Sequence, residues 1–218
     1  MWPCKDGHAS VTFLFGLGFG RFTRNLMEWI HEEGMCDDAT RDKDWWVRER
    51  AMDALIDLAG ANLSRYLVPY LADRSPIVRR FAIGALRRLK DPAALPHLLQ
   101  RAKVDDDWWA REDALAAAAE LGDSRAIVPI VGLLRDRPEL RSACCRALVD
   151  LGATTAVDAI ADLLADADPD VRLSALSALR DLDGQRHARA VEMCADDGET
   201  RVRAAARELA ARWAVLDE

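Results

Sequence analysis

Aromatic side chains other than tryptophan are scarce in this sequence, which has two Tyr and five Phe among 218 residues. Long apolar runs are also missing. The most apolar stretch, Val11 to Phe19, is about nine residues, whereas a membrane-crossing helix needs roughly 20. Half of the residues are hydrophobic, mostly Ala and Leu, which is too many for a disordered chain and typical of helices. We therefore expect a folded helical protein with no membrane partner.

Cysteine is limited to five residues, an odd number, and no C-x-x-C motif occurs. This pattern argues against a disulfide framework or a zinc knuckle and favours a reduced, cytoplasmic protein. The four histidines are scattered, and no nucleophile–histidine set stands out. We therefore expect no metal, no cofactor and no catalytic residues.

Basic residues are outnumbered, with 30 Lys and Arg against 37 Asp and Glu and a net charge of −7. A net acidic chain is a poor general binder of nucleic acid, because phosphate contacts need Lys and Arg. We therefore expect a protein or peptide partner rather than a nucleic acid.

An internal repeat organises most of the chain. An arginine recurs every 30 to 32 residues, and apolar or small residues follow it at offsets 3, 6, 7 and 10. These offsets lie on one face of an α-helix, which predicts a buried face. The six arginines are Arg48, Arg79, Arg111, Arg141, Arg172 and Arg203.

Residues around each arginine mark where its helix begins and ends. Pro76, Pro138 and Pro169 suit the first helical position, three residues before the arginine. The preceding residue is then the N-cap, as with Asp44, Ser75, Asp107 and Asp168. Glycines that follow are expected to end the helices: Gly60, Gly122, Gly152 and Gly184. A second apolar segment completes each unit, so each unit is predicted to be two short antiparallel helices that must stack to bury their apolar faces.

The run from Asp166 through Arg172 to Leu182 carries the pattern D-x-D-x-x-V-R-x-x-A-x-x-A-L-x-x-L. It resembles the HEAT-like repeat family, in the short variety first described in phycobilisome lyases. The resemblance implies an all-α solenoid of about six two-helix repeats, with the arginine-led helices on the concave side. It also implies an Asp–Arg ladder between successive repeats, in which the aspartates are Asp42, Asp73, Asp105, Asp166 and Asp197. The fourth repeat is one residue shorter and has Asp136 at offset five, so we expect an altered rung there.

Residues 1–41 do not match the repeat. They contain one amphipathic segment, roughly Thr23 to Glu33, that we expect to cap the open end of the first repeat. The predicted division is therefore an N-terminal cap or docking segment, 1–41, and a solenoid, 42–218. The repeats are predicted near 42–72, 73–104, 105–135, 136–165, 166–195 and 196–218.

One repeat is basic within the acidic chain. Residues 73–104 hold eight basic and two acidic residues, a net of +6, so the remainder carries −13. Offsets 1, 5 and 8 from each arginine fall opposite the core face, which predicts an exposed strip that includes Glu49, Arg80, Arg87, Glu112 and Ala119. The strip is interpreted either as ion pairs between neighbouring repeats or as a surface for an acidic partner segment.

Four of the seven tryptophans form two near copies of one motif, Asp-Trp-Trp-x-Arg-Glu, that flank the basic repeat. Trp45 and Trp46 begin one arginine-led helix, and Trp108 and Trp109 begin another. Their offsets point away from the core, and stacking of helices about 10 Å apart would separate the two pairs by about 20 Å. Each pair is either local cover for the inter-repeat turn or a binding surface, because Trp is enriched in binding hot spots.

Three functions follow from these features. The first is a non-enzymatic scaffold or adaptor whose paired tryptophans and basic repeat bind acidic and apolar groups of a partner. The second is a DNA glycosylase of the HEAT-like alkylpurine type, in which Trp109 and Asp113 would act together. The third is a bilin lyase or its chaperone subunit, which the repeat subtype suggests. The oligomeric state stays open.

Overall fold

The computed structural model describes residues 2–4, 7–9, 64–74 and 76–216. The chain divides into two compact units, residues 1–63 and 64–218. In the first unit, strands β1 (Trp2–Cys4) and β2 (Gly7–Ala9) pair antiparallel, with Pro3 opposite His8. The repeat pattern does not predict this hairpin. The predicted helix between Thr23 and Glu33 and the boundary at residue 41 lie outside the described residues, so both stay predictions.

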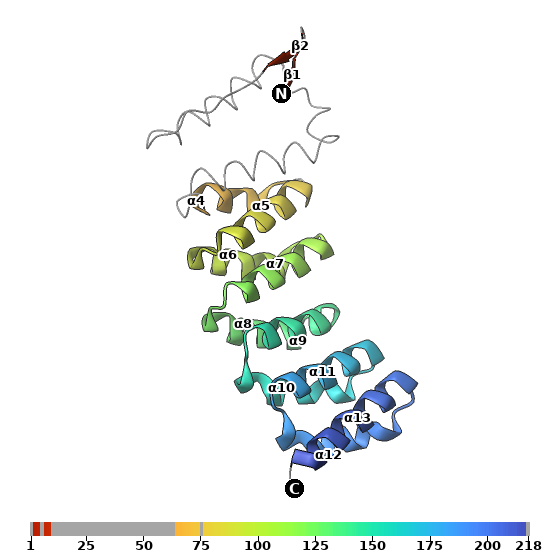
Figure 1. Cartoon of the computed structure of the whole chain (residues 1–218). Helices are drawn as coiled ribbons and strands as arrows, with labels where there is room; N and C mark the ends of the chain where they lie inside the picture. The colour runs from red at the N-terminus through yellow and green to blue at the C-terminus, as the bar shows by residue number, and fades with distance from the viewer. Residues whose placement is uncertain (1, 5–6, 10–63, 75, 217–218) are drawn as a thin grey trace. The chain divides into compact units, whose positions relative to one another are not determined.

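The second unit is a stack of helix pairs (Figure 1). The arginine-led helices form one layer, in which each helix contacts the next. This layer consists of α5 (Pro76–Leu89), α7 (Trp108–Glu120), α9 (Arg141–Asp150), α11 (Pro169–Asp181) and α13 (Thr200–Leu216).

The second apolar segment of each repeat forms the other layer. It comprises α4 (Ser64–Leu67) with 3-10 helix η2 (Val68–Ala72), α6 (Leu95–Val104), α8 (Ile127–Asp136), α10 (Val157–Ala161) with η7 (Asp162–Ala165), and α12 (Ala188–Met193) with η9 (Cys194–Asp196). Short 3-10 turns introduce or join these helices: η3 (Pro92–Ala94), η4 (Ser124–Ala126), η5 (Pro138–Leu140), η6 (Thr154–Ala156) and η8 (Gln185–His187). The solenoid architecture is thus as predicted.

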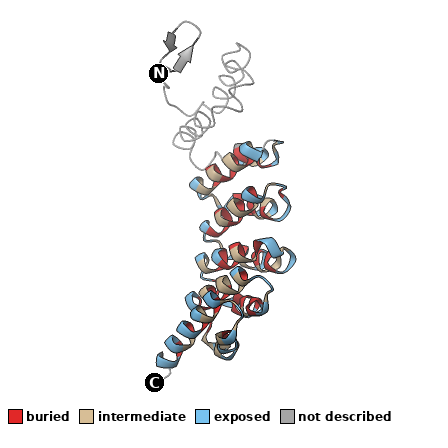
Figure 2. Ribbon diagram, turned by 90° about the vertical axis from the view of Figure 1, so that its right-hand side faces the viewer, coloured by how far each residue is buried: buried red, intermediate tan, exposed pale blue. Residues whose placement is uncertain are grey.

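The core forms where the two layers and successive repeats face each other (Figure 2). The small residue at offset 3 is completely buried in every described repeat, because the neighbouring helix approaches closely at this position. This column consists of Ala82, Ala114, Cys144, Ala175 and Ala206. Burial raises the pKa of the Cys144 and Cys145 thiols to about 12, so both are inert core residues.

Most helix ends follow the predicted signals. The Asp107 and Asp168 carboxylates accept hydrogen bonds from the Trp109 and Asp170 amides, so both are N-caps. Gly122 and Gly152 take positive φ values of 68° and 60°. The caps at Asp44 and Ser75 and the stop at Gly60 fall outside the described residues.

Two predicted ends are wrong. Gly184 has φ −78°, and Asp183 before it takes the left-handed conformation with φ 56°, which Asp tolerates better than most residues. Pro138 is not the first residue of α9. It opens η5 instead, and α9 begins at Arg141, because the shortened loop leaves Arg137 at the position where α7 and α11 have a capping Asp.

Ion pairs join consecutive repeats at the loops that precede the arginine-led helices. The Asp105 carboxylate accepts from the Arg79 guanidinium at 2.7 Å and from its own repeat's Asp107 amide at 3.0 Å. Arg172 with Asp197 repeats both contacts, and Arg141 pairs with Asp166 at 2.6 Å. These arginines thus link one repeat to the loop of the next.

The same arginines fasten their own loops. An Nη1 atom donates to the main-chain carbonyl of the aspartate six residues earlier, as from Arg79 to Asp73 at 2.9 Å and from Arg172 to Asp166 at 2.8 Å. Burial would raise the pKa of Asp105, but the hydrogen bonds from Arg79 and the Asp107 amide outweigh it and lower that pKa. Arg48 and Asp42, the predicted first rung, are outside the described residues.

Asp105→Asn removes the charge from a carboxylate that is 0 % exposed, beside a guanidinium that is 6 % exposed. Because it leaves Arg79 buried with its main partner neutral, we expect the free energy of unfolding to fall by about 3 kcal/mol in urea titrations followed by circular dichroism. The matched control is Asp181→Asn, whose carboxylate is 40 % exposed and pairs with Arg180. Its effect should stay within about 0.5 kcal/mol, and equal losses in both variants would refute a structural role for the ladder.

Candidate functional site

Trp108 and Trp109, hereafter the Trp pair, form the first turn of α7 and are 50 % and 51 % exposed. Their ring centroids are 4.1 Å apart with planes inclined by 31°. The N-cap bond from the Trp109 amide to Asp107 holds this turn in place. The sequence therefore places two large apolar rings side by side, half open to solvent.

The arginines of the preceding repeat are engaged with α7 and its loop. Arg80 forms an ion pair with Asp107, at 2.8 Å from Nη2 to Oδ1, and its guanidinium lies 5.9 Å from the Trp109 ring centroid. Arg87 pairs with Glu120. The hydrogen bonds from these arginines lower the pKa values of Asp107 and Glu120. Much of the positive charge predicted to attract an acidic partner is thus balanced by the next repeat.

Asp113, the residue that a glycosylase would use with Trp109, lies on the same helix as the Trp pair. Burial raises its pKa, while the charges of Arg80 and Arg87 oppose that shift. Ala119 was predicted on the exposed strip, but it is 1 % exposed, because the α7 helix is Ala-rich and packs closely on both of its neighbours. Glu112 is 34 % exposed at its side chain and lies near Arg146, at 4.0 Å.

The ladder changes at Arg111, beside the Trp pair. Its Nη1 donates to the Asp105 carbonyl at 2.9 Å, as in other repeats. Asp136 is the last residue of α8 and is exposed, and the carboxylate paired with Arg111 is that of Glu139, at 3.9 Å. This distance exceeds that of a hydrogen bond.

The Nε atom of Arg111 is buried and has no hydrogen-bond partner in the described part of the chain. At the intact rungs, Nε of Arg79 and of Arg172 donates to the aspartate of the next repeat, at 2.9 and 2.7 Å. An unsatisfied buried donor costs about 1–3 kcal/mol. The shorter loop of the fourth repeat therefore leaves Nε of Arg111 without a hydrogen-bond acceptor.

A depression of about 370 Å³ opens at this point, lined by Trp108, Arg111, Glu112, Glu139 and Leu140. Its size is at the lower end of the roughly 300–1,000 Å³ typical of small-ligand pockets. Trp108 thus faces the following repeat, whereas Trp109 meets Arg80 of the preceding one.

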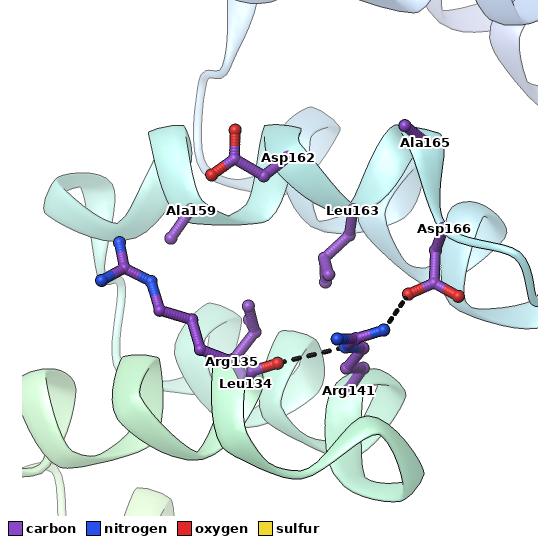
Figure 3. Close-up of a pocket in the computed structure, with 8 residues that line it drawn as sticks. All are labelled: Leu134, Arg135, Arg141, Ala159, Asp162, Leu163, Ala165 and Asp166. Atoms are coloured by element: carbon purple, nitrogen blue, oxygen red, sulfur yellow. Dashed lines mark hydrogen bonds and ion pairs between the residues drawn. The ribbon is translucent and has the colours of Figure 1, made fainter.

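A second depression, of about 260 Å³, lies between the α8 end and the α10–η7 segment (Figure 3). There Arg141 donates from Nε to the Leu134 carbonyl at 3.2 Å and from Nη1 to Asp166 at 2.6 Å. Arg135 extends at the end away from Asp166. Because its rung is complete, this depression offers no vacant donor comparable with Arg111 Nε.

The residues that the structure describes hold no group of three or more His, Cys, Asp or Glu side chains arranged for a metal ion. None of their helices has the length and apolar character for crossing a bilayer.

Several predicted site residues cannot be placed, because Trp45, Trp46 and Glu49 are outside the described ranges. Of the others, the structure brings Arg80 to Trp109 and Glu112 to the depression beside Trp108, while Arg87 is turned to Glu120. Sequence reasoning missed Glu139 and the orphaned Nε of Arg111. The signal was present as the five-residue spacing between Asp136 and Arg141.

Comparison with known families agrees with this architecture. The profile that describes HEAT repeats matches residues 33–119 and 127–211, most of the chain. The chain belongs to the HEAT-repeat family. The match begins inside the segment that was assigned to the N-terminal cap.

Two curated relatives share 33 % identity with this chain. The Bilin biosynthesis protein PecE of Nostoc sp. matches over 93 residues, 42 % of this chain and 36 % of the relative. The Bilin biosynthesis protein PecE of Mastigocladus laminosus matches over 116 residues, 49 % of this chain and 40 % of the relative. Each alignment spans well under half the length of the relative.

Solved structures share the fold. A chain in the complex of CpcE and CpcF of phycocyanin lyase from Nostoc sp. aligns with TM-score 0.52 and 22 % identity, over 77 % of this chain and 71 % of that one. A designed armadillo repeat protein in complex with the peptide (KR)4 aligns with TM-score 0.53 and 19 % identity, over 79 % of this chain and 95 % of that one.

The half-exposed Trp pair contributes little to folding if it serves a surface role. We expect Trp108→Ala and Trp109→Ala each to lower the free energy of unfolding by at most about 1.5 kcal/mol, from lost ring contact and partial burial. Trp213→Ala is the matched comparison, because Trp213 is 4 % exposed. It should cost about 3–5 kcal/mol in the same urea titration.

Losses at Trp108 and Trp109 as large as the loss at Trp213 would show that the pair is structural cover for the turn.

Proposed function

We propose that this chain is a non-enzymatic scaffold or adaptor that binds a polypeptide partner through the Trp pair, on the face built by the arginine-led helices. The observation that carries this proposal is the pair of stacked rings at 50 % and 51 % exposure, next to a depression of about 370 Å³. Half-exposed tryptophans offer large rigid contact area and are enriched among binding hot spots.

The charged residues around the rings support orientation of the partner more than affinity. Arg80 and Arg87 already have carboxylate partners, so an acidic partner segment would have to share them. Exposed ion pairs of this kind contribute little free energy but influence association rate and register. The apolar contact is therefore the principal source of affinity in this proposal.

A role on DNA has less support. Three arginines of the basic repeat, Arg79, Arg80 and Arg87, are already paired with Asp105, Asp107 and Glu120, which reduces the cations available for a row of phosphate contacts. Burial raises the pKa of Asp113 despite the opposing charges of Arg80 and Arg87, and these two arginines are themselves held by carboxylates of the next repeat.

The binding test compares Trp108→Ala/Trp109→Ala with a matched control, Val128→Ala/Met193→Ala, which removes two side chains of 80 % and 77 % exposure from the other helix layer. Partners captured by the unaltered protein are purified and titrated against each variant. We expect binding at least roughly tenfold weaker for the tryptophan variant and unchanged for the control. Equal binding by both variants would contradict the proposal. A Trp45→Ala/Trp46→Ala variant extends the test to the predicted second pair.

A second candidate is a role with bilins, favoured by the 33 % identity to two proteins named for bilin biosynthesis. Stacked indole rings suit the flat conjugated face of a tetrapyrrole. The same proteins are therefore also purified after co-expression with a bilin source. Visible absorbance that co-purifies with the unaltered protein and is lost in the tryptophan variant would favour this candidate over a polypeptide partner. Colourless protein would exclude it.

A further inference from the structure

Arg111 is the ladder arginine whose acceptor is missing, and it lies in the depression beside Trp108. Its Nε atom is buried without a partner, and its side chain is 17 % exposed. The equivalent Nε and Nη2 atoms of Arg79 and Arg172 grip one aspartate carboxylate between them. Arg111 therefore has the same two-donor edge with no carboxylate in hydrogen-bond contact, and its Nε lies beneath the surface of the depression.

We propose that a carboxylate of the polypeptide partner, from an Asp or Glu next to an apolar side chain, completes this rung in trans. This inference deepens the proposed function and rests on it. The guanidinium edge would accept the carboxylate as a two-point, charge-assisted contact, which is the geometry that Arg and carboxylate favour. Trp108 and Leu140, which line the same depression, would receive the adjoining apolar side chain.

Glu139 controls access to this edge. Its carboxylate lies 3.9 Å from Arg111 Nη2 and 3.7 Å from Arg137 Nη1, and its side chain is 44 % exposed. Because it is shared loosely between two arginines, it can turn to Arg137 when a partner carboxylate enters. Glu112 also borders the depression, with its nearest cation, Arg146, at 4.0 Å. These two acids disfavour a freely diffusing anion and select a carboxylate that is delivered together with an apolar anchor.

The size and position of the depression fit that occupant. About 370 Å³ admits one or two side chains rather than a folded surface. At the intact rungs, the loop of the next repeat within the same chain supplies the carboxylate, as Asp105 does for Arg79 and Asp197 for Arg172. A partner segment would supply from outside what the shortened fourth repeat lacks.

The probes are two peptides, acetyl-Gly-Ser-Leu-Glu-Leu-Ser-Gly-amide and the same peptide with Gln in place of Glu. Each is titrated calorimetrically against the full chain, and the Arg111 Nε–Hε resonance is followed by NMR. We expect the Glu peptide to bind about tenfold more tightly than the Gln peptide. Of the two peptides, only the Glu peptide should shift the Arg111 Nε–Hε resonance. Arg111→Gln should abolish the preference, and Glu139→Gln should increase it. Arg180→Gln, which alters an exposed arginine on α11, is the matched control and should leave the preference unchanged.

Equal binding of the two peptides, an unmoved Arg111 resonance, or a preference that survives Arg111→Gln would overturn the inference. If Arg111→Gln does not fold, the two peptides and the resonance in the unaltered chain decide the matter, with Arg111→Lys as the second variant. Failure of the two proposals is distinguishable. If the Glu and Gln peptides bind equally and Trp108→Ala abolishes both interactions, the proposed function stands and the rung fails. If the preference for the Glu peptide survives in Trp108→Ala/Trp109→Ala, the rung stands and the proposed function fails.

Discussion

The Arg–Asp pair that links one repeat to the next, as in Arg79–Asp105, Arg141–Asp166 and Arg172–Asp197, is the constraint on which the solenoid depends. One carboxylate accepts from the previous repeat's arginine and from an amide of its own loop. Asp105 and Asp197 therefore each fix both the position of the neighbouring repeat and the conformation of their own loop. The helix that follows begins three residues later, at Trp108 and at Thr200, and Asp107 caps the first of these helices. Repeat spacing, loop conformation and helix start are therefore set by the same short segment.

Where the spacing between the aspartate and the arginine is one residue shorter, the ladder is incomplete and a depression opens. The fourth repeat lacks one residue, Asp136 ends in α8, and Arg111 keeps a buried Nε without an acceptor. The depression at that point is walled by Trp108, whose ring and that of Trp109 are half open to solvent. Natural chains retain such local violations at functional sites more than elsewhere. The coincidence of the incomplete rung and the exposed rings is why both proposals concern the same few residues.

The sequence predicts the repeated helices of this molecule well, because a small residue that recurs at one helical position indicates close packing of neighbouring helices there. The completely buried column from Ala82 to Ala206 and the cap at Asp168 follow directly from spacing. The spacing does not predict which of several carboxylates an exposed arginine will pair with. From the sequence, Arg80 and Arg87 fit either ion pairs between repeats or a surface for an acidic partner. In the structure they pair with Asp107 and Glu120, carboxylates that come within reach only when α5 and α7 stack. Gly184 failed as a marker because Asp183 takes the left-handed conformation instead, and Pro138 failed because Arg137 precedes it in place of a capping Asp, so that it opens the 3-10 helix η5.

One missing residue in the fourth repeat separates a closed rung from an open one. A crystal structure of the chain with a single Ala inserted between Asp136 and Arg137, which restores the six-residue spacing of the other repeats, would test this relation. We expect the carboxylate of Asp136 then to lie about 3 Å from Nε of Arg111 and to fill the space beside Trp108. An Asp136 that remains exposed at the end of α8, with Glu139 still the carboxylate nearest Arg111, would contradict it.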